Sequence, residues 1–169
     1  FNADGTKMFV LDEVNDRVNE YTLSTGFDLA STVAYIDSFS VAGQELKPTG
    51  FTFNTDGTKM FVVGWKGNDV NEYTLTTGFD LSAGVSFVDS FSVVAQNADI
   101  RDVKFSTDGT VMFVMGRQST IDSVFRYTLT TGFDVSTATY EDSYYVGDQE
   151  TAGNSIAFST DGLKMFVLG

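Results

Sequence analysis

The chain has 169 residues, of which 42% are hydrophobic and 14% aromatic, enough for one globular core of ordinary size. It contains no Cys and no His, which excludes disulfides, thiolate metal sites, cysteine nucleophiles and the commonest general base. The 10 basic and 23 acidic residues give a net charge of −13, so the surface repels nucleic acids and anionic membranes.

A repeat of about 52 residues organises the chain. Its first motif begins at Phe1 (FNADGTKMFV), Phe53 (FNTDGTKMFV), Phe105 (FSTDGTVMFV) and Phe158 (FSTDGLKMFV). A second motif begins at Val18 (VNEYTLSTGFDL), Val70 (VNEYTLTTGFDL) and Val124 (VFRYTLTTGFDV). We predict one propeller segment over residues 1–169, with repeats at about 1–52, 53–104 and 105–157 and a partial repeat at 158–169.

The second repeat shows the predicted elements in chain order. A short strand at 51–54 leads into Asp56-Gly57, a hairpin-turn signal because Gly accepts positive φ. The run KMFVVG at 59–64 is apolar at consecutive positions, which indicates a strand buried on both faces. Further strands are predicted at 70–75 and 85–93, with a break at Thr77-Gly78, and no stretch has helical periodicity. Four antiparallel strands per repeat predict an all-β propeller with about three blades and a partial one, and a β-solenoid or sandwich is the alternative.

The segment PTGFTFNTDGTKMFVVG, followed by DVNEYTL, resembles the YVTN-type and lactonase-like repeats of bacterial propellers. It is also similar to tandem repeats of large bacterial secreted, surface or phage-associated proteins. The resemblance covers the whole chain. It implies that the strand ending at Phe53 is innermost in its blade and that 85–93 is outermost. Such blades host adhesion, scaffolding, ligand binding and occasional catalysis, so the resemblance predicts the fold better than the function.

The motifs that recur unchanged are interpreted as structural. The Asp-Gly turns include a near match to the sialidase Asp-box at Ser106–Phe113, but the arginines are too scattered for a sialidase site. In each Thr-Gly-Phe-Asp segment, the Phe is expected to plug its blade and the Asp to fix a turn. The acidic group around Asp12 is interpreted as a solvated turn, with a hard-cation site as the alternative.

The connections between strands predict which face carries function. The two recurring turns lie on one face of the disc, whereas the loops on the opposite face differ between repeats. Since function sits on loops held by a rigid scaffold, the variable face is predicted to be the recognition face. Its loops are 12–17, 64–69 and 116–123, together with 42–50, 94–102 and 147–155.

Residues before each inner strand are expected to ring the central channel: Thr49, Arg101 and Asn154, beside Gly50, Asp102 and Ser155. Trp65, the only Trp, beside Lys66 suits a sugar or a protein, or alternatively packs over a blade edge. A Gln recurs at one loop position and either binds a ligand or bonds between blades. The predicted ligand-binding residues are Gln44, Trp65, Lys66, Gln96, Arg101, Asp102, Arg117, Gln149 and Asn154.

The main functional hypothesis is a non-enzymatic binding or scaffolding module without catalytic residues, metal site or cofactor. The first alternative is a carboxylate- or Ca²⁺-dependent hydrolase, lactonase- or glycosidase-like, using Asp99, Asp102 and Asn154 at the channel mouth. The second alternative is a purely structural fragment of a large repeat array.

Partner predictions follow from the repeat count. Phe1–Asp12 and Phe158–Gly169 are the same part of the repeat, so the chain holds three whole repeats, too few to close a ring. We expect either a fragment of a longer natural propeller or self-association into one shared ring, as a dimer with six blades or a trimer with nine. Protein or carbohydrate ligands are compatible with the surface, whereas nucleic acid and membrane insertion are not expected. The resemblance implies an extracellular or cell-surface location, although no signal-peptide pattern opens the chain.

Overall fold

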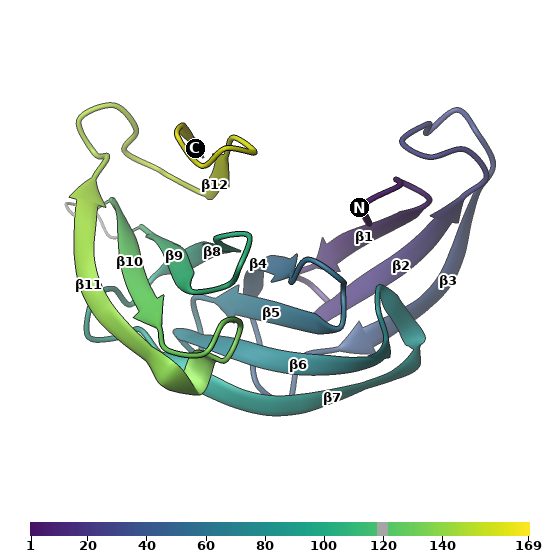
Figure 1. Cartoon of the computed structure of the whole chain (residues 1–169), viewed down its shortest axis with the longest axis horizontal. Helices are drawn as coiled ribbons and strands as arrows, with labels where there is room; N and C mark the ends of the chain where they lie inside the picture. The colour runs from purple at the N-terminus through teal and green to yellow at the C-terminus, as the bar shows by residue number, and fades with distance from the viewer. Residues whose placement is uncertain (118–121) are drawn as a thin grey trace.

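The computed structural model describes residues 1–117 and 122–169 and shows an all-β chain (Figure 1). A single turn of 3₁₀ helix, η1 (Val135–Thr137), interrupts the strands of the described part. The strands are β1 (Lys7–Asp12), β2 (Arg17–Leu23), β3 (Val33–Ser40), β4 (Pro48–Phe53), β5 (Lys59–Gly64), β6 (Asp69–Thr77), β7 (Asp80–Ser92), β8 (Ile100–Phe105), β9 (Val111–Gly116), β10 (Ser123–Leu129), β11 (Ala138–Tyr145), β12 (Ser155–Phe158) and β13 (Met165–Leu168).

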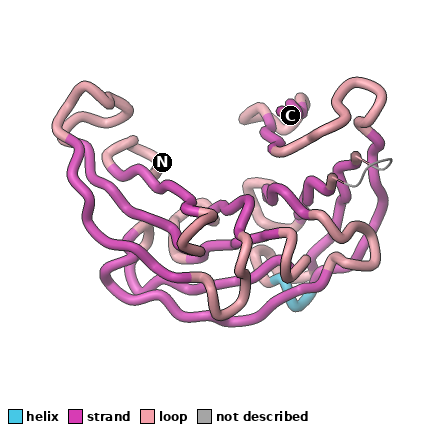
Figure 2. Tube along the Cα trace, turned by 180° about the vertical axis from the view of Figure 1, so that it is seen from behind, coloured by secondary structure: helices cyan, strands magenta, loops and turns pink. Residues whose placement is uncertain are grey.

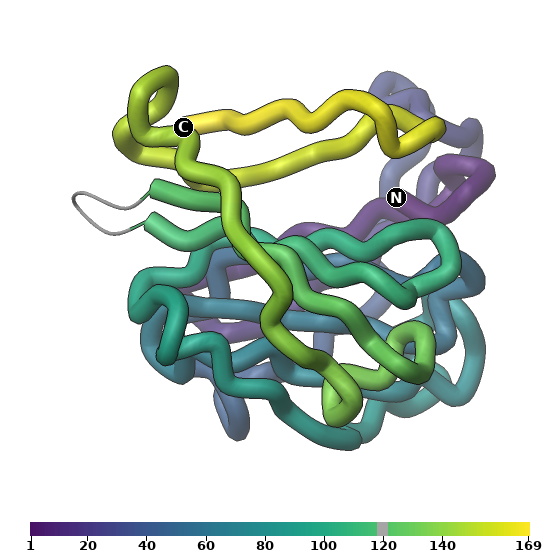
Figure 3. Tube along the Cα trace, turned by 60° about the vertical axis from the view of Figure 1, so that its left-hand side comes forward, coloured from purple at the N-terminus to yellow at the C-terminus, as the bar shows by residue number. Residues whose placement is uncertain are grey.

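The strands form four antiparallel sheets, which are the blades of a β-propeller. The second blade has the order β4-β5-β6-β7 and the third the order β8-β9-β10-β11, while the first holds β1-β2-β3 and the fourth β12-β13. Figures 1 and 2 show the sheets side by side along an arc, and in Figure 3 the β12–β13 hairpin lies beside the third blade. The inner strands β4, β8 and β12 contact one another in turn, as expected around a propeller channel. The predicted propeller is confirmed, and the solenoid and sandwich alternatives are wrong.

The hydrophobic core lies between the blades. One cluster joins Phe9 and Val18 of the first blade to Met60 and Val62 of β5, and another joins Phe61 on the other face of β5 to the third blade. The residues of KMFVVG therefore point alternately to the two neighbouring blades, which explains why the whole run is apolar. A third, smaller cluster packs Ile156 of β12 against Met115, Val124 and Val146.

The two recurring turns close against each other on one face. Gly57 has φ 73°, and the Phe79 ring covers it so closely that a Cβ there would lie 2.2 Å from the ring. Phe79 itself adopts φ 57°, and its N–H donates to the Gly57 carbonyl at 3.0 Å. Asp56 accepts bonds from the Thr58 N–H and hydroxyl at 3.0 and 2.6 Å. The predicted structural role of both motifs is confirmed.

A buried ion pair connects the first blade to the second, and another connects the second blade to the third. Glu72 accepts from Lys59 Nζ at 2.7 Å within the second blade, and its other oxygen accepts the Val135 N–H of the third blade at 3.0 Å. Lys59 Nζ also donates to the Phe133 carbonyl at 2.6 Å. Lys7 and Glu20 repeat this arrangement toward Phe79 and Leu81. We call each such contact between neighbouring blades a joint.

The four strands predicted in the second repeat are present, but β4 begins earlier, at Pro48, β6 is longer, at Asp69–Thr77, and the start of the fourth strand differs most. The fourth strand of the second repeat was expected at 85–93, whereas β7 begins at Asp80 because Thr77 and Asp80 pair across the turn. In the third repeat the same segment contains η1 instead, with Asp134 accepting the Ser136 N–H as its N-cap. None of the helices described is long and apolar enough to cross a membrane.

Candidate functional site

The variable loops meet on the face opposite the Asp-Gly turns. The buried Glu45 carboxylate accepts the Lys47 N–H at 2.8 Å, and it reaches the next loop through the Lys66 and Gly67 N–H groups at 3.3 and 2.8 Å. Gly64 leaves room for it, because a Cβ there would lie 2.4 Å from the Glu45 carboxyl carbon. The loops 42–50 and 64–69 are therefore joined by charge-assisted hydrogen bonds from backbone N–H groups to one buried carboxylate.

A cavity of about 270 Å³ opens at the channel mouth on this face. Thr49 of β4, Arg101 of β8 and Asn154, just before β12, line it together, as expected from their repeat position. Thr49 Oγ1 donates to the Ile100 carbonyl at 2.8 Å, which fixes the two inner strands relative to each other. The complete lining is Leu11, Glu13, Pro48, Thr49, Arg101 and Asn154.

Arginine and aspartate side chains set the charge beside the cavity. Arg101 Nη2 lies 2.7 Å from Asp99 Oδ1, and Arg117 Nε lies 3.7 Å from Asp99 Oδ2. Arg117 Nη1 donates to Asn154 Oδ1 at 3.2 Å. The Arg101 Nε is buried and has no hydrogen-bond partner within the described chain. One guanidinium nitrogen of this cavity-lining residue is thus desolvated and, among the described residues, without a hydrogen-bond acceptor.

Asp102 follows Arg101 in β8, but both of its carboxylate oxygens accept hydrogen bonds from other residues of the chain. Its Oδ1 accepts Lys104 Nζ at 2.6 Å and the Val103 N–H at 2.9 Å. Its Oδ2 accepts the Ser155 hydroxyl at 2.7 Å and the Ile156 N–H at 3.1 Å. The carboxylate is 4% exposed and does not line the cavity, so it holds β12 against β8.

The recurring glutamines face tyrosines of the next blade. Tyr73 donates its hydroxyl to Gln44 Oε1 at 3.2 Å, and Tyr127 donates to Gln96 Oε1 at 3.3 Å. Burial raises the pKa of both tyrosines, and the Glu45 carboxylate adds to the shift at Tyr73. These two glutamines therefore bond across joints, to side chains rather than to backbone. Gln149 lies in the third such loop, where its N–H donates to the Val146 carbonyl.

Trp65 and Lys66 lie on the same face but outside the cavity lining. Trp65 is 39% exposed, and Lys66 Nζ lies 5.5 Å from its ring centroid in a cation–π contact. The loop predicted at 116–123 includes residues 118–121, which lie outside the described residues.

Sequence reasoning missed Glu13, an exposed carboxylate in the cavity wall. The sequence did contain a signal for it. Glu13, Trp65 and Arg117 occupy the same position of the repeat, directly after strands β1, β5 and β9. That position carries a different chemistry in every repeat. The acidic group around Asp12, which includes Glu13, was interpreted as a solvated turn with a hard-cation site as the alternative, and Asp12 does hold the turn by accepting the Val14 and Asn15 N–H groups.

Within residues 1–117 and 122–169, no three acidic side chains come together in a way that would hold a metal ion. The site consists of one unpaired carboxylate, one partly unpaired guanidinium, an amide and a hydroxyl.

A scan against protein-family models finds no match, and a search of curated proteins finds no relative. Solved structures share the fold. A candidate 6-phosphogluconolactonase from Bacteroides fragilis matches with a TM-score of 0.68 and 16% identity, over 98% of this chain and 45% of that one. The hydrazine synthase of Kuenenia stuttgartiensis matches with a TM-score of 0.65 and 14% identity, over 99% of this chain and 40% of that one. The periplasmic gluconolactonase of Pseudomonas aeruginosa matches with a TM-score of 0.56 and 17% identity, over 85% of this chain and 37% of that one.

The fold is therefore that of the lactonase-like β-propellers, and this chain spans less than half the length of those structures. The comparisons correct the main functional hypothesis. The expected non-enzymatic binding or scaffolding module is wrong as the leading interpretation, because lactone hydrolases recur among the structures that share the fold. They favour the hydrolase alternative. Its candidate Asn154 lies in the cavity wall, while Asp99 and Asp102 are occupied by ion pairs beside it.

Proposed function

We propose that the channel mouth hydrolyses a lactone of a sugar acid. The observation that carries the proposal is a single cavity lined by Glu13, Arg101 and Asn154, which bring a carboxylate, a guanidinium and an amide to one place. Hydrolysis of an ester needs a base for water and donors for the developing oxyanion, and these groups supply both.

The chemistry assigns one role to each group. Glu13 accepts a proton from water as the water oxygen attacks the lactone carbonyl carbon. The Arg101 guanidinium donates a hydrogen bond to the carbonyl oxygen, where negative charge develops in the tetrahedral intermediate. The bond between the carbonyl carbon and the ring oxygen then breaks, the ring oxygen takes the proton from Glu13, and the open hydroxy acid leaves.

The cavity and its neighbours suit a small polar lactone. About 270 Å³ accommodates a single sugar-sized ring, and Thr49 and Asn154 provide hydrogen bonds for hydroxyl groups. The names of the structural neighbours, 6-phosphogluconolactonase and gluconolactonase, agree with this substrate class.

Hydrolysis of D-glucono-1,5-lactone by the full chain, followed by proton release against the spontaneous rate, tests the proposal. We expect Glu13→Gln to lower kcat/KM by about 10²–10⁴-fold and Arg101→Ala by about 10²–10³-fold. Glu141→Gln and Arg126→Ala are matched controls, because both side chains lie on the outer part of the third blade, and they should leave the rate unchanged. No acceleration over buffer by the unaltered chain, or equal loss in the controls, would overturn the proposal.

We further propose membership in the YVTN-type repeat proteins and a location outside the cytoplasm. The FNTDGTKMFV core and the periplasmic gluconolactonase among the structural neighbours support both. Fractionation of the cells that produce the protein tests the location, and recovery with the cytoplasmic enzymes would contradict it.

A further inference from the structure

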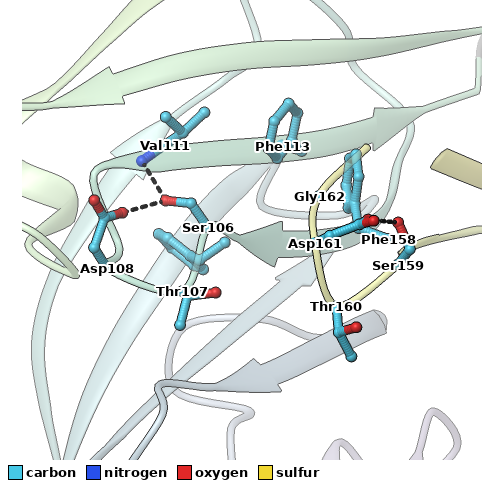
Figure 4. Close-up of a pocket in the computed structure, with 11 residues that line it drawn as sticks. Ser106, Thr107, Asp108, Val111, Phe113, Phe158, Ser159, Thr160, Asp161 and Gly162 are labelled. Carbon is cyan, nitrogen blue, oxygen red and sulfur yellow. Dashed lines mark hydrogen bonds between the residues drawn. The ribbon is translucent and has the colours of Figure 1, made fainter. Parts of the chain in front are cut away.

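The polar groups on the two faces of the disc differ in what they do. On the face of the Asp-Gly turns, a cavity of about 530 Å³ lies between the β8–β9 turn and the β12–β13 turn (Figure 4). Asp108 accepts a hydrogen bond there from Ser106 Oγ at 2.7 Å. Asp161 accepts one from Ser159 Oγ at 2.6 Å. These carboxylates stabilise their own turns, so groups suited to a ligand are expected on the opposite face, where the loops differ.

The second strand of each blade directs alternate side chains toward the next blade. Phe61 and Val63 of β5 belong to the core cluster that includes Ile100 of β8, in the third blade. Trp65 follows Val63 by two residues and comes directly after Gly64, the last residue of β5. The period of two along a strand therefore directs Trp65 toward the third blade.

The residues that take the position of Trp65 in the first and third blades point the same way. Glu13 lines the channel-mouth cavity together with Thr49, which lies on the inner strand of the next blade. Arg117 Nη1 donates to Asn154 Oδ1 at 3.2 Å, and Asn154 comes directly before the inner strand β12 of the next blade. A side chain at this position therefore reaches the start of the next blade's inner strand.

For Trp65 the corresponding neighbour is Arg101, near the start of β8. Arg101 lines the cavity of about 270 Å³, and so does Pro48, whose partner across β4 and β5 is Gly64. Trp65 is the residue after Gly64, but it does not itself line this cavity. Its place is therefore beside the cavity, where an aromatic ring extends the binding surface without narrowing the cavity.

The loop that presents Trp65 is held in one conformation. The buried Glu45 carboxylate accepts the N–H groups of the next two residues, Lys66 and Gly67, and a Cβ on Gly67 would lie 2.8 Å from Glu45 Oε2. Asn68 closes the loop with φ 58°, and its N–H donates to the Gly64 carbonyl at 3.3 Å. Because the backbone is ordered before any ligand arrives, binding at this loop costs little conformational entropy.

Trp65 and Lys66 together match the chemistry of a sugar ring. The Trp65 side chain is 39% exposed and offers a flat apolar surface with one N–H donor at its edge. The exposed Lys66 places its ammonium 5.5 Å from the centroid of the indole ring, which adds donors beside that surface. A pyranose has the complementary form, because the C–H groups of its face pack on an aromatic ring while its hydroxyl groups accept hydrogen bonds at the rim.

We propose that this face binds the lactone of a disaccharide acid and that Trp65 holds its second sugar ring. The cavity of about 270 Å³ has room for one ring, which is the lactone between Glu13 and Arg101. The second ring projects from the cavity and lies on the indole, with Lys66 donating to its hydroxyl groups. A β-linked glucose suits this surface, because its equatorial hydroxyls leave C–H groups on both faces of the ring. This role of Trp65 rests on the proposed lactone hydrolysis, for which it supplies the substrate class.

The ratio of kcat/KM for cellobiono-1,5-lactone to kcat/KM for glucono-1,5-lactone tests the role of Trp65. We expect a ratio of at least about 10 for the full chain, because the second ring adds binding energy. Trp65→Ala should bring the ratio to about 1, and Trp65→Phe should retain part of the preference. Tyr144→Ala is the matched control, since Tyr144 is 64% exposed on the outer strand β11, and it should keep the full ratio. Hydrolysis with a ratio near 1, or with a ratio that Trp65→Ala leaves intact, would overturn this role while the lactonase proposal stands.

Intrinsic fluorescence tests the second-ring site without any hydrolysis, because Trp65 is the only Trp of the chain. Cellobionate, the open acid that keeps its glucose ring, should shift the emission to shorter wavelengths and saturate at a concentration at least about tenfold lower than gluconate. Tyr144→Ala should leave this response unchanged. The response without hydrolysis of either lactone would contradict the lactonase proposal and support the second-ring site. Cellobionate binding no more tightly than gluconate, or an emission that neither acid changes, would overturn the site.

Discussion

At the scale of single residues, the repeat makes equivalent positions into internal controls. Gly57 and Gly162 have the same backbone conformation, with φ 73° and 71°, but different surroundings. A Cβ at Gly57 would lie 2.2 Å from the Phe79 ring, whereas a Cβ at Gly162 would meet nothing within 4 Å. The backbone strain of an L-residue is common to both sites, so any difference between them measures the ring contact.

We expect Gly162→Ala to cost about 1 kcal/mol of unfolding free energy, and Gly57→Ala to cost about 1–3 kcal/mol more because Phe79 must move. Urea denaturation of the two variants measures both costs. Equal costs would show that Phe79 yields without penalty, and would contradict the role assigned to the ring.

At the scale of elements, the alternation along β5 and the ion pairs under it explain why blades stay adjacent. Glu72 is 1% exposed, and it bonds both to Lys59 in its own blade and to a backbone N–H in the next. Removal of the Glu72 carboxylate leaves the Val135 N–H and the Lys59 ammonium without their acceptor in a poorly solvated joint. This costs more stability than the intact ion pair contributes.

Glu72→Ala should therefore lower the unfolding free energy by about 3 kcal/mol, although Lys59 is partly exposed and recovers some hydration. Asp142→Ala is the comparison, because it removes the carboxylate of the exposed Arg126–Asp142 pair and should cost about 0–1 kcal/mol. Calorimetric melting of the two variants measures the difference, and similar melting temperatures would refute a structural role for the joint pair.

The same elements show what could be predicted from sequence. The repeat predicted the strands, the hairpin turns and the two faces of the disc, because Gly, Phe and apolar residues recur in it at fixed positions. The site followed less well. Arg101 and Asn154 line one cavity, whereas Glu13, which also lines it, was not among the predicted binding residues, and Asp102, which does not line it, was. Whether a carboxylate is free or bonded depends on partners from another blade, such as Ser155 on Asp102, which no local pattern reveals.

At the scale of the whole molecule, two electrostatic effects oppose each other as pH changes. The net charge of −13 produces self-repulsion in the compact state at neutral pH, and protonation of carboxylates relieves it. The Asp-Gly turns act in the opposite direction. Hydrogen bonds from the neighbouring Thr or Ser side chains and from backbone N–H groups lower the pKa of one Asp per repeat below its usual 3.8, at Asp4, Asp56, Asp108 and Asp161.

The sign of each effect fixes the shape of the stability profile. A carboxyl whose pKa is lower in the folded chain stabilises it fully above pH 3.8, and this stabilisation disappears as pH falls through the lowered value. We therefore expect the urea midpoint to rise or hold from about pH 7 to about pH 4.5, as repulsion falls, and then to drop toward about pH 2.5. Salt at about 0.5 M should raise the midpoint at neutral pH by screening and so flatten the first limb. The double variant Asp56→Asn and Asp108→Asn keeps acceptors for the Thr58 and Thr110 N–H groups without titrating, so its drop at low pH should be smaller. An unchanged drop in the double variant would show that these turns do not set the acid limit of the fold.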